Sequence, residues 1–423
     1  MEEYFQSLRK YNFWEGNVPE VGFLRKDYTE KIIDYTGNKL IKVLVGQRRV
    51  GKSYILRQIA QRLITDGVNP QNIFYVNKEF TEFDFITDYR DLNILLRAYK
   101  EQLQPAGKVW IFIDEIQNII GWEHFVNSNS QDFVENYEIF VTGSNSTMLS
   151  GELATLLSGR YVNFEIMPFS FSEYAGITNK TPDKAGFIEY MESGALPELF
   201  LLPNDETKRH YISATKDTVL LRDIIQRHNI KDAKLLEDIF IYLVNNASNL
   251  VSVLNIVNFL KSKGRKTTYD TVANYIGFIE NTFLVHRVER YDIRGKETIS
   301  GNSKYYVNDL SFKNYLYPGF GYGLGYKLEN LIYLILRRAG YSIYTGTIKN
   351  KEIDFVAQKG DRIIYLQSTY LLTDEETIAR EYNPLEAVPD NYEKIVVSLD
   401  DVTYPSRNGI RHIQTWELEN WLK

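Results

Sequence analysis

Apolar residues along the chain fall into two spacings, and the alternation between them predicts the architecture. Between residues 38 and 170, short unbroken apolar runs alternate with stretches of helical spacing. Unbroken runs are typical of strands covered on both faces, and helices between them indicate a mainly parallel α/β sheet. The predicted strands are LIKVLVG (40–46), NIFYVNKE (72–79), KVWIFIDE (108–115), YEIFVTGS (137–144) and RYVNFEIMPFS (160–170), with helices at 52–64 and 92–103.

The pattern becomes mainly helical from Ser170 to Glu289. Within this part, a helix over Ser252–Lys263 is followed by a glycine turn and a second helix, which either Thr267 or Thr268 caps. The run FLVHRVERY (283–291) then predicts a strand. Helix, turn, helix and strand is the sequence form of a winged helix-turn-helix.

Strands return in the last third of the chain, around a helix predicted at 328–341 and a glycine-rich turn YPGFGYGLGYK (317–327). The predicted division is a helical lead-in (1–37), an α/β core (38–170), a helical and winged-helix-like segment (171–295) and a third α/β unit (296–423). The strands of that last unit are predicted at 342–348, 352–359, 362–370 and 394–400, after a segment SKYYVNDLSF (303–312).

Composition narrows the function classes. The 423 residues carry a net charge of -6 and no cysteine. The missing cysteines exclude disulfides, thiolate zinc sites and cysteine nucleophiles. With this net charge the chain as a whole is not basic, so a nucleic-acid site would have to be a local basic patch. No apolar run has the length of a signal-peptide core or a membrane span, and we expect a soluble cytoplasmic protein.

One segment matches the phosphate-binding pattern G-x-x-x-x-G-K-[ST] at every position, after a predicted strand and before a predicted helix. Its glycines let backbone N–H groups approach phosphate oxygens, and the helix adds its positive dipole end. The lysine neutralises β/γ-phosphate charge, and the serine ligates Mg²⁺. For the two loop arginines, a solvated or partner-facing role stays open. The predicted ATP-contacting residues are Gly46, Gln47, Arg48, Arg49, Val50, Gly51, Lys52, Ser53 and Tyr54.

The ends of two later predicted strands carry the residues expected to bind Mg²⁺ and to activate and orient the attacking water. The apolar run 109–113 ends in Asp114 and Glu115. In a nucleotide site, the aspartate holds Mg²⁺ through water and the glutamate activates the attacking water. The next predicted strand ends near Ser144 and Asn145, either of which would orient that water. A plain turn at this strand end is the alternative.

With these segments, the chain resembles AAA+ superfamily ATPases of bacteria and archaea that carry a C-terminal restriction-endonuclease-like domain. Further matching segments are LSGR (157–160), PFSFSEY (168–174), GALPELF (194–200), KLENLIYLILRRAGY (327–341) and KEIDFVAQKGDRIIYLQSTY (351–370). The resemblance implies an Mg²⁺-dependent ATPase that switches or remodels a partner protein through its C-terminal modules.

The resemblance also implies that Arg160 is an arginine finger, acting on a γ-phosphate of its own or a neighbouring subunit. An arginine salt-bridged beside a strand is the alternative. Arg222 is a weaker candidate for nucleotide sensing. AAA+ relatives often form rings, which makes a homo-oligomer an open expectation.

A basic cluster lies between the two helices of the winged-helix-like segment: Lys261, Lys263, Arg265 and Lys266. Such a cluster can neutralise DNA phosphates. The second helix (269–282) has no lysine or arginine, although base-reading helices usually carry long polar donors. Two hypotheses follow. In the first, the segment only packs against protein. In the second, the chain is a DNA-binding protein whose affinity for DNA is controlled by ATP.

The last unit resembles nucleases of the PD-(D/E)xK type in its spacing. Glu329, Asp354 and Gln367 stand at the positions of the metal-binding cage, but Thr369 stands where the lysine is expected. Without that lysine, the attacking water loses its activator. A nuclease-like fold is predicted, and nuclease activity is not.

Overall fold

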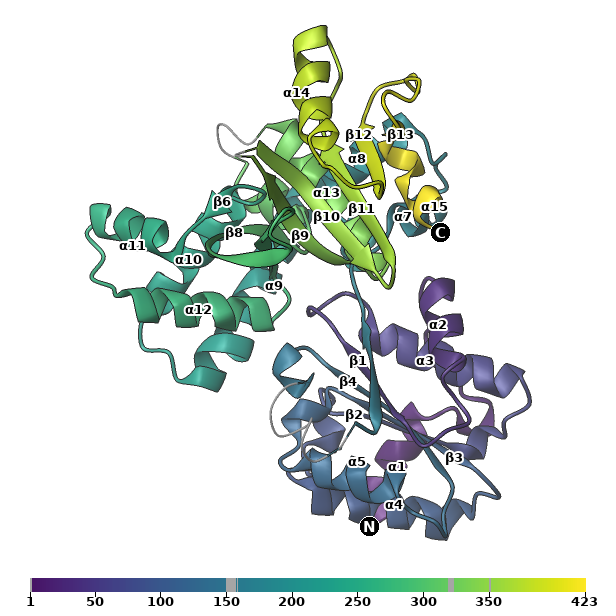
Figure 1. Cartoon of the computed structure of the whole chain (residues 1–423). Helices are drawn as coiled ribbons and strands as arrows, with labels where there is room; N and C mark the ends of the chain where they lie inside the picture. The colour runs from purple at the N-terminus through teal and green to yellow at the C-terminus, as the bar shows by residue number, and fades with distance from the viewer. Residues whose placement is uncertain (1, 150–156, 158, 319–322, 350) are drawn as a thin grey trace. The chain divides into compact units, whose positions relative to one another are not determined.

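The computed structural model describes all residues except 1, 150–156, 158, 319–322 and 350. Ser158 of the LSGR segment and part of the glycine-rich turn at 317–327 therefore lie outside the described residues. The chain divides into two compact units, 1–166 and 167–423 (Figure 1). Each is described by itself.

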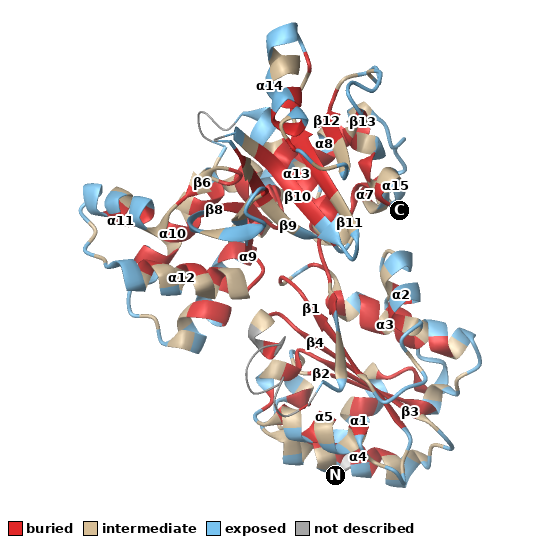
Figure 2. Cartoon of the chain, in the orientation of Figure 1, coloured by how far each residue is buried: buried red, intermediate tan, exposed pale blue. Residues whose placement is uncertain are grey.

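The first unit is built on a five-stranded parallel sheet in the order β2-β3-β4-β1-β5. Its first four strands in chain order are buried along their whole length, which fits their unbroken apolar sequence (Figure 2). The sequence predicted all five strands. They are β1 (Ile41–Val45), β2 (Ile73–Asn77), β3 (Val109–Asp114), β4 (Tyr137–Gly143) and β5 (Tyr161–Glu165).

Helices form two groups around this sheet. Helix α1 packs against α4, which packs against α5, while α2 packs against α3 (Figure 1). Right-handed crossovers place α3 and the α4–α5 pair on opposite faces. Helix α5 was not predicted, because its sequence is largely polar. The helices are α1 (Glu2–Tyr11), α2 (Lys26–Ile33), α3 (Lys52–Thr65), α4 (Tyr89–Leu103) and α5 (Trp122–Ser130), with short 3₁₀ turns at 14–16, 70–72, 81–83, 116–118 and 146–149.

The second unit begins with helices. Most have a side-chain N-cap, among them Thr268, which accepts a hydrogen bond from the N–H of Thr271 at 3.3 Å and so decides between the two predicted caps. The helices are α7 (Phe171–Thr178), α8 (Lys184–Ser193), α9 (Asp205–Thr218), α10 (Ala233–Asn245), α11 (Val253–Ser262) and α12 (Tyr269–Asn281), with a 3₁₀ turn at 197–201 and a π-helix at 219–226.

A single mixed sheet joins the rest of this unit, in the order β13-β12-β11-β10-β9-β7-β8-β6. Because β7 pairs with both β8 and β9, the sheet runs through the predicted boundary at 295/296. The four-part division of the chain stays a prediction, as does the winged helix. The strands are β6 (Leu250–Val251), β7 (Val285–Asp292), β8 (Glu297–Val307), β9 (Ser342–Ile348), β10 (Lys351–Lys359), β11 (Arg362–Ser368), β12 (Glu393–Ser398) and β13 (Ile410–Gln414).

The long helix α13 packs against the strands of this sheet from β8 to β11, and α14 packs against β10 to β13 (Figure 1). Within the described residues, no helix combines the length and apolar character needed to cross a bilayer. The helices that complete the unit are α13 (Leu324–Arg338), α14 (Glu375–Glu386) and α15 (Leu418–Leu422), with a π-helix at 312–316 and a 3₁₀ turn at 415–417.

Candidate functional site

Two glycines shape the loop between β1 and α3. A Cβ at Gly46 would lie 2.2 Å from the carbonyl oxygen of Ile166, and the φ of 152° is one that side-chain-bearing residues rarely adopt. Gly51 has a φ of 94° and caps the start of α3. Both positions therefore need glycine. The loop they form exposes backbone N–H groups next to a helix N-terminus, as an anion site requires.

Lys52 is held inside this loop by the loop's own backbone. Its Nζ donates to the carbonyl oxygens of Gly46 and Gln47, both at 3.0 Å, and lies 3.7 Å from Glu115 Oε1. Only 4% of Lys52 is exposed. A buried ammonium held mainly by neutral carbonyls keeps most of its positive charge available to an anionic ligand.

The other loop residues differ in their surroundings. Arg48 is half-buried, 2.5 Å from Glu79 Oε1 and 4.0 Å from Glu115 Oε2. Arg49 is exposed in a left-handed conformation, and Val50 lies in the core. Arg48 is thus near Glu115.

The start of α3 carries the last two predicted ligand residues. The Ser53 hydroxyl is near enough to Asp114 to lower the pKa of that carboxyl, which brings the two predicted magnesium ligands to the same place. Tyr54 is 37% exposed, beside Gly22 of the lead-in segment, and the guanidinium of Arg57 lies over its ring. The lead-in therefore runs directly past the predicted nucleotide-binding helix.

Asp114 ends β3 in a fully buried position. Its carboxylate accepts hydrogen bonds from Thr142 Oγ1 at 2.5 Å, Asn77 Nδ2 at 3.0 Å and the Tyr75 hydroxyl at 3.2 Å. Burial raises the pKa of Asp114, and the neighbouring Glu115 adds to that rise. A nearby cation would reverse both effects, so the site favours a positive charge beside Asp114.

Glu115 leaves the strand in a left-handed conformation, with a φ of 55°. Its N–H donates to Thr142 Oγ1 at 2.9 Å. Burial alone would raise the pKa of Glu115, but Lys52 and Arg48 outweigh burial and hold that pKa below its usual value. Glu115 is therefore ionised at neutral pH, as a general base must be.

Strand β4 lies between β1 and β3, and its end carries the residues that link the loop to the acids. Gln117 Nε2 donates to Glu115 Oε2 at 2.5 Å and to Ser144 Oγ at 3.3 Å. Ser144 and Asn145 are both buried. Ser144, one of the two predicted candidates, is connected to Glu115 through Gln117.

Arg160 is exposed and lies at the opposite end of the sheet from the phosphate loop. Its carbonyl accepts from Ile41, the first residue of β1, whereas the loop follows Val45, the last. Four residues of strand separate these ends by about 13 Å at ~3.3 Å per residue. The structure thus separates Arg160 from the loop of its own chain.

Sequence reasoning missed three residues that support this site. Thr142 bonds both acids, Gln117 links Glu115 to Ser144, and Arg25 donates from its buried guanidinium to the carbonyl of Val50 at 2.9 Å. Thr142 follows the apolar run of β4 and had a detectable signal, because the ends of parallel strands share one edge. Arg25 had none, since nothing in the lead-in predicts burial of an arginine.

Comparison with known proteins agrees with this geometry. A family model described as an AAA domain matches residues 38–175, and a model of a domain of unknown function matches 184–323. The chain is 34% identical over 403 residues to an uncharacterized protein of Haemophilus influenzae, covering 94% of this chain and 98% of the relative. An uncharacterized protein of Methanocaldococcus jannaschii is 32% identical over 386 residues, covering 86% and 82%. The chain belongs to this family of AAA-domain proteins.

The AAA match covers the whole parallel sheet of the first unit, from before β1 into α7. The predicted fold class, a P-loop AAA+ core followed by helices and a further α/β part, is confirmed. Among solved structures, the ORC1 protein of Aeropyrum pernix in complex with DNA aligns at 15% identity and a TM-score of 0.34, over 72% of this chain and 94% of ORC1.

The second unit of this AAA-domain protein brings together the residues predicted from nuclease spacing. Asp354 Oδ2 accepts from the N–H and hydroxyl of Ser368 at 2.8 and 2.7 Å, and the Asp354 N–H donates to Gln367 Oε1 at 3.2 Å. Glu329 and Thr369 are also buried. The cluster also contains a lysine that was not predicted there from the sequence. Lys304, on β8, contacts Glu329.

The basic turn between α11 and α12 borders an open hollow of about 710 Å³. Lys261, Arg265 and Lys266 line it together with Lys231, whereas Lys263 does not. Arg265 is bound to Asp238 at 2.8 Å. Lysine ammonium groups around a hollow of this size favour an anionic partner over an apolar one.

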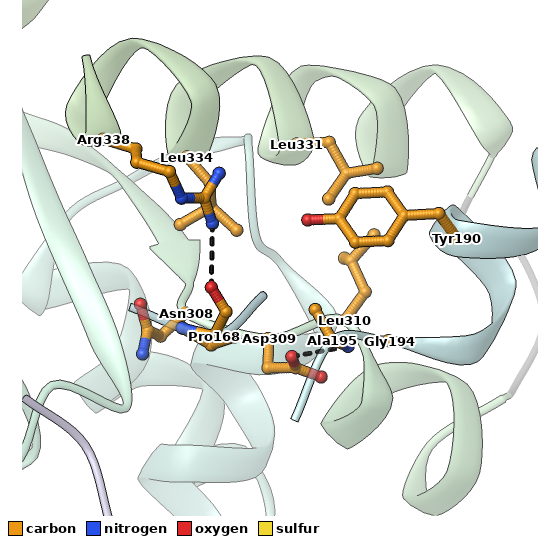
Figure 3. A pocket seen from close by; sticks show the side chains of 10 residues that line it. All are labelled: Pro168, Tyr190, Gly194, Ala195, Asn308, Asp309, Leu310, Leu331, Leu334 and Arg338. Carbon is orange, nitrogen blue, oxygen red and sulfur yellow. Dashed lines mark hydrogen bonds between the residues drawn. The ribbon is translucent and has the colours of Figure 1, made fainter. Parts of the chain in front are cut away.

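A smaller cavity between α13, α8 and the end of β8 has about 10 Å³ of free volume, room for one water molecule. Figure 3 shows Arg338 reaching the carbonyl of Pro168, at 3.1 Å, and Asp309 accepting from the N–H of Ala195, at 2.8 Å. This cavity is too small for a substrate, and its polar groups serve the fold.

Proposed function

We propose that this AAA-domain protein binds ATP with Mg²⁺ and hydrolyses it. One observation carries the proposal: the hydroxyl of Thr142 bonds both Asp114 and Glu115, on the strand end that lies between those acids and the phosphate loop. The lysine, the two acids and the loop are thereby gathered at one edge of a single sheet.

The residues at this edge fit the two absent groups. Gly46 lets the loop run against the carbonyl of Ile166, where a Cβ would not fit, and the amides of such a loop are suited to a triphosphate. Asp114 and Ser53 offer hard oxygen donors near each other, and Mg²⁺ needs only one or two protein ligands besides phosphates and water. Bound ATP–Mg²⁺ supplies the phosphoanhydride that is cleaved and the charge that neutralises its oxygens.

Each residue then has a defined task. Lys52 binds the β- and γ-phosphates, and Glu115 accepts the proton of the attacking water. Ser144, connected to Glu115 through Gln117, orients that water. Because Arg160 is at the far end of the sheet, its role as a finger is assigned to the nucleotide of a neighbouring subunit.

The output of the cycle is movement of the second unit. ATP occupancy changes the arrangement of the C-terminal modules and so switches or remodels a protein partner. The same proposal includes an assembled form, in which Arg160 completes the site of an adjacent copy.

Phosphate release by the parent chain, Lys52→Ala and Glu115→Gln tests the proposal, with binding of a fluorescent ATP analogue measured in parallel. Glu115→Gln should keep binding and lose turnover, whereas Lys52→Ala should lose both. Arg160→Ala should keep binding but lose turnover, and mixing it with Glu115→Gln should restore turnover, since each variant supplies what the other lacks. Turnover equal to the parent's in both Lys52→Ala and Glu115→Gln would contradict the assignment.

A second candidate function is ATP-gated DNA binding, favoured by the lysine-lined hollow between α11 and α12. Duplex affinity should fall steeply with salt, because phosphate contacts release counterions. The double variant Lys261→Ala/Lys266→Ala should weaken binding, and Lys263→Ala is the matched control outside the hollow. Affinity insensitive to salt or to ATP would exclude this candidate.

A further inference from the structure

The second unit contains a carboxylate cluster whose centre is occupied by a side chain. Lys304 Nζ lies 2.8 Å from Glu329 Oε1, 2.8 Å from Glu352 Oε1 and 4.0 Å from Asp354 Oδ1. Only 3% of Lys304 is exposed. Glu329 comes from α13, and the other two acids come from β10. One ammonium therefore lies among three acids from two elements.

We propose that the Lys304 ammonium takes the place of the divalent cation of a nuclease-type site, so that this cluster binds no metal and works as an internal ionic clamp. The spacing that predicted a nuclease-like unit implies a metal held by Glu329 and Asp354. The observed contacts do not fit such a metal.

The first reason is that one oxygen of Glu329 and one of Asp354 already accept hydrogen bonds. Glu329 Oε1 accepts from both Lys304 and the Tyr306 hydroxyl, the latter at 2.7 Å. Asp354 Oδ2 accepts two hydrogen bonds from Ser368. Mg²⁺ requires oxygens at about 2.0–2.1 Å in octahedral geometry, and these oxygens are turned to donors instead.

The second reason is charge. An ammonium within hydrogen-bond distance of two of the acids repels a divalent cation from the same space. Across the residues that the structure describes, no group of three or more acidic, histidine or cysteine side chains is arranged to hold a metal ion. Lys304 thus supplies the positive charge that balances these acids. Because Lys304 is part of the chain, that charge is always present.

The clamp also has a mechanical place in the fold. The residues of β8 before Ser303 are mostly exposed, and those from Ser303 onward are buried. Lys304 pairs with Val288 of β7 and with Leu250 of β6. The cluster therefore ties the three-stranded edge next to the winged-helix-like helices to α13 and β10 in the sheet core.

The test uses Mn²⁺ alone as the probe, in full-length chains that carry Asp114→Asn so that the nucleotide site does not contribute. Calorimetry and thermal unfolding, with Mn²⁺ or with chelator, compare this chain with the same chain carrying Lys304→Met. The expected result for Asp114→Asn alone is no Mn²⁺ binding and one melting temperature under both conditions. Mn²⁺ binding that disappears when Asp354→Asn is added would overturn the proposal.

Adding Lys304→Met should lower the melting temperature and create Mn²⁺ binding, with Mn²⁺ restoring part of the lost stability. Lys313→Met is the matched control, because Lys313 is also buried in this unit but bonds Asn245. It should destabilise without creating a metal site. A Lys304→Met chain that stays as stable as its parent and binds no Mn²⁺ would refute the clamp.

If Lys304→Met prevents folding, Lys304→Met/Glu329→Gln provides the second measurement. Removing an acid together with its cation should recover folding and part of the melting temperature, which a role in packing alone would not produce. Failure of that rescue would count against the proposal.

Discussion

The two units each contain a buried lysine beside acids, yet the two arrangements differ in what the lysine touches. Lys52 donates to two backbone carbonyls and stays 3.7 Å from Glu115. Lys304 lies 2.8 Å from the oxygens of Glu329 and Glu352. The first arrangement leaves its charges open to a ligand, and the second neutralises them internally.

Backbone geometry produces this difference. The glycine loop folds its own carbonyls around Lys52, so the ammonium is held without a carboxylate contact. Lys304 is on a strand, and its ammonium contacts carboxylates of neighbouring elements. Burial alone would lower the pKa of Lys304, but Glu329, Asp354 and Glu352 outweigh burial and raise that pKa. The same residue types thus make a ligand site or a closed ion cluster.

Removing the acid of the open cluster should have the largest effect. Glu115→Gln should lower kcat for ATP by about 10²–10⁴, the usual contribution of a general base. The matched change in the closed cluster, Glu329→Gln, should leave kcat unchanged. Steady-state phosphate release measures both. A similar loss of kcat in the two variants would break the distinction between the clusters.

Replacing the lysine of the open cluster should affect binding and leave the fold intact. Lys52→Met should weaken ATP binding by about a hundredfold, or about 3 kcal/mol, because a charge-assisted contact with phosphate is lost. Thermal unfolding without nucleotide should be close to that of the parent, since Lys52 has no short contact with an acid. Calorimetric titration with ATP and a melting curve check both parts.

Thr142→Val should destabilise the first unit by about 1–3 kcal/mol, because it removes a donor from buried Asp114 and an acceptor from the Glu115 N–H. Thr142→Ser keeps the hydroxyl and is the control. Urea unfolding of the parent and both variants gives the comparison. A loss of stability for serine with none for valine would mean that the methyl group, and not the hydrogen bonds, matters.

A third buried acid has neither a bound lysine nor a phosphate loop. Burial raises the pKa of Asp309 to about 6, although backbone N–H groups oppose the rise (Figure 3). The folded state then holds the proton more tightly than the unfolded state, so this group stabilises the fold as pH falls through 6. From pH 7 to pH 5 the gain should be about 1 kcal/mol. Urea unfolding at both pH values should show it for the parent and not for Asp309→Asn.

The sequence predicted the parallel sheet and the phosphate loop because both depend on local patterns, namely unbroken apolar runs and a complete motif. It also predicted that Asp354, Gln367 and Glu329 belong to one cluster, from spacing within consecutive elements. It did not predict Lys304 there, since β8 reaches the cluster only through pairing with β7, a long-range event that no local pattern records. Arg25 was missed for the same reason, whereas Thr142 could have been found from its place at the end of a predicted strand.

The backbone of Gly46 lies directly against that of Ile166, where the first unit ends. The N–H of Ile166 donates to Val45 at 2.7 Å, and its carbonyl occupies the space where Gly46 would carry a side chain. Ile166 is also the last residue before the second unit begins. The strand leaving the sheet is thus anchored on the first residue of the loop. We expect any shift of that loop to move the segment that follows β5 at the point where it leaves the sheet.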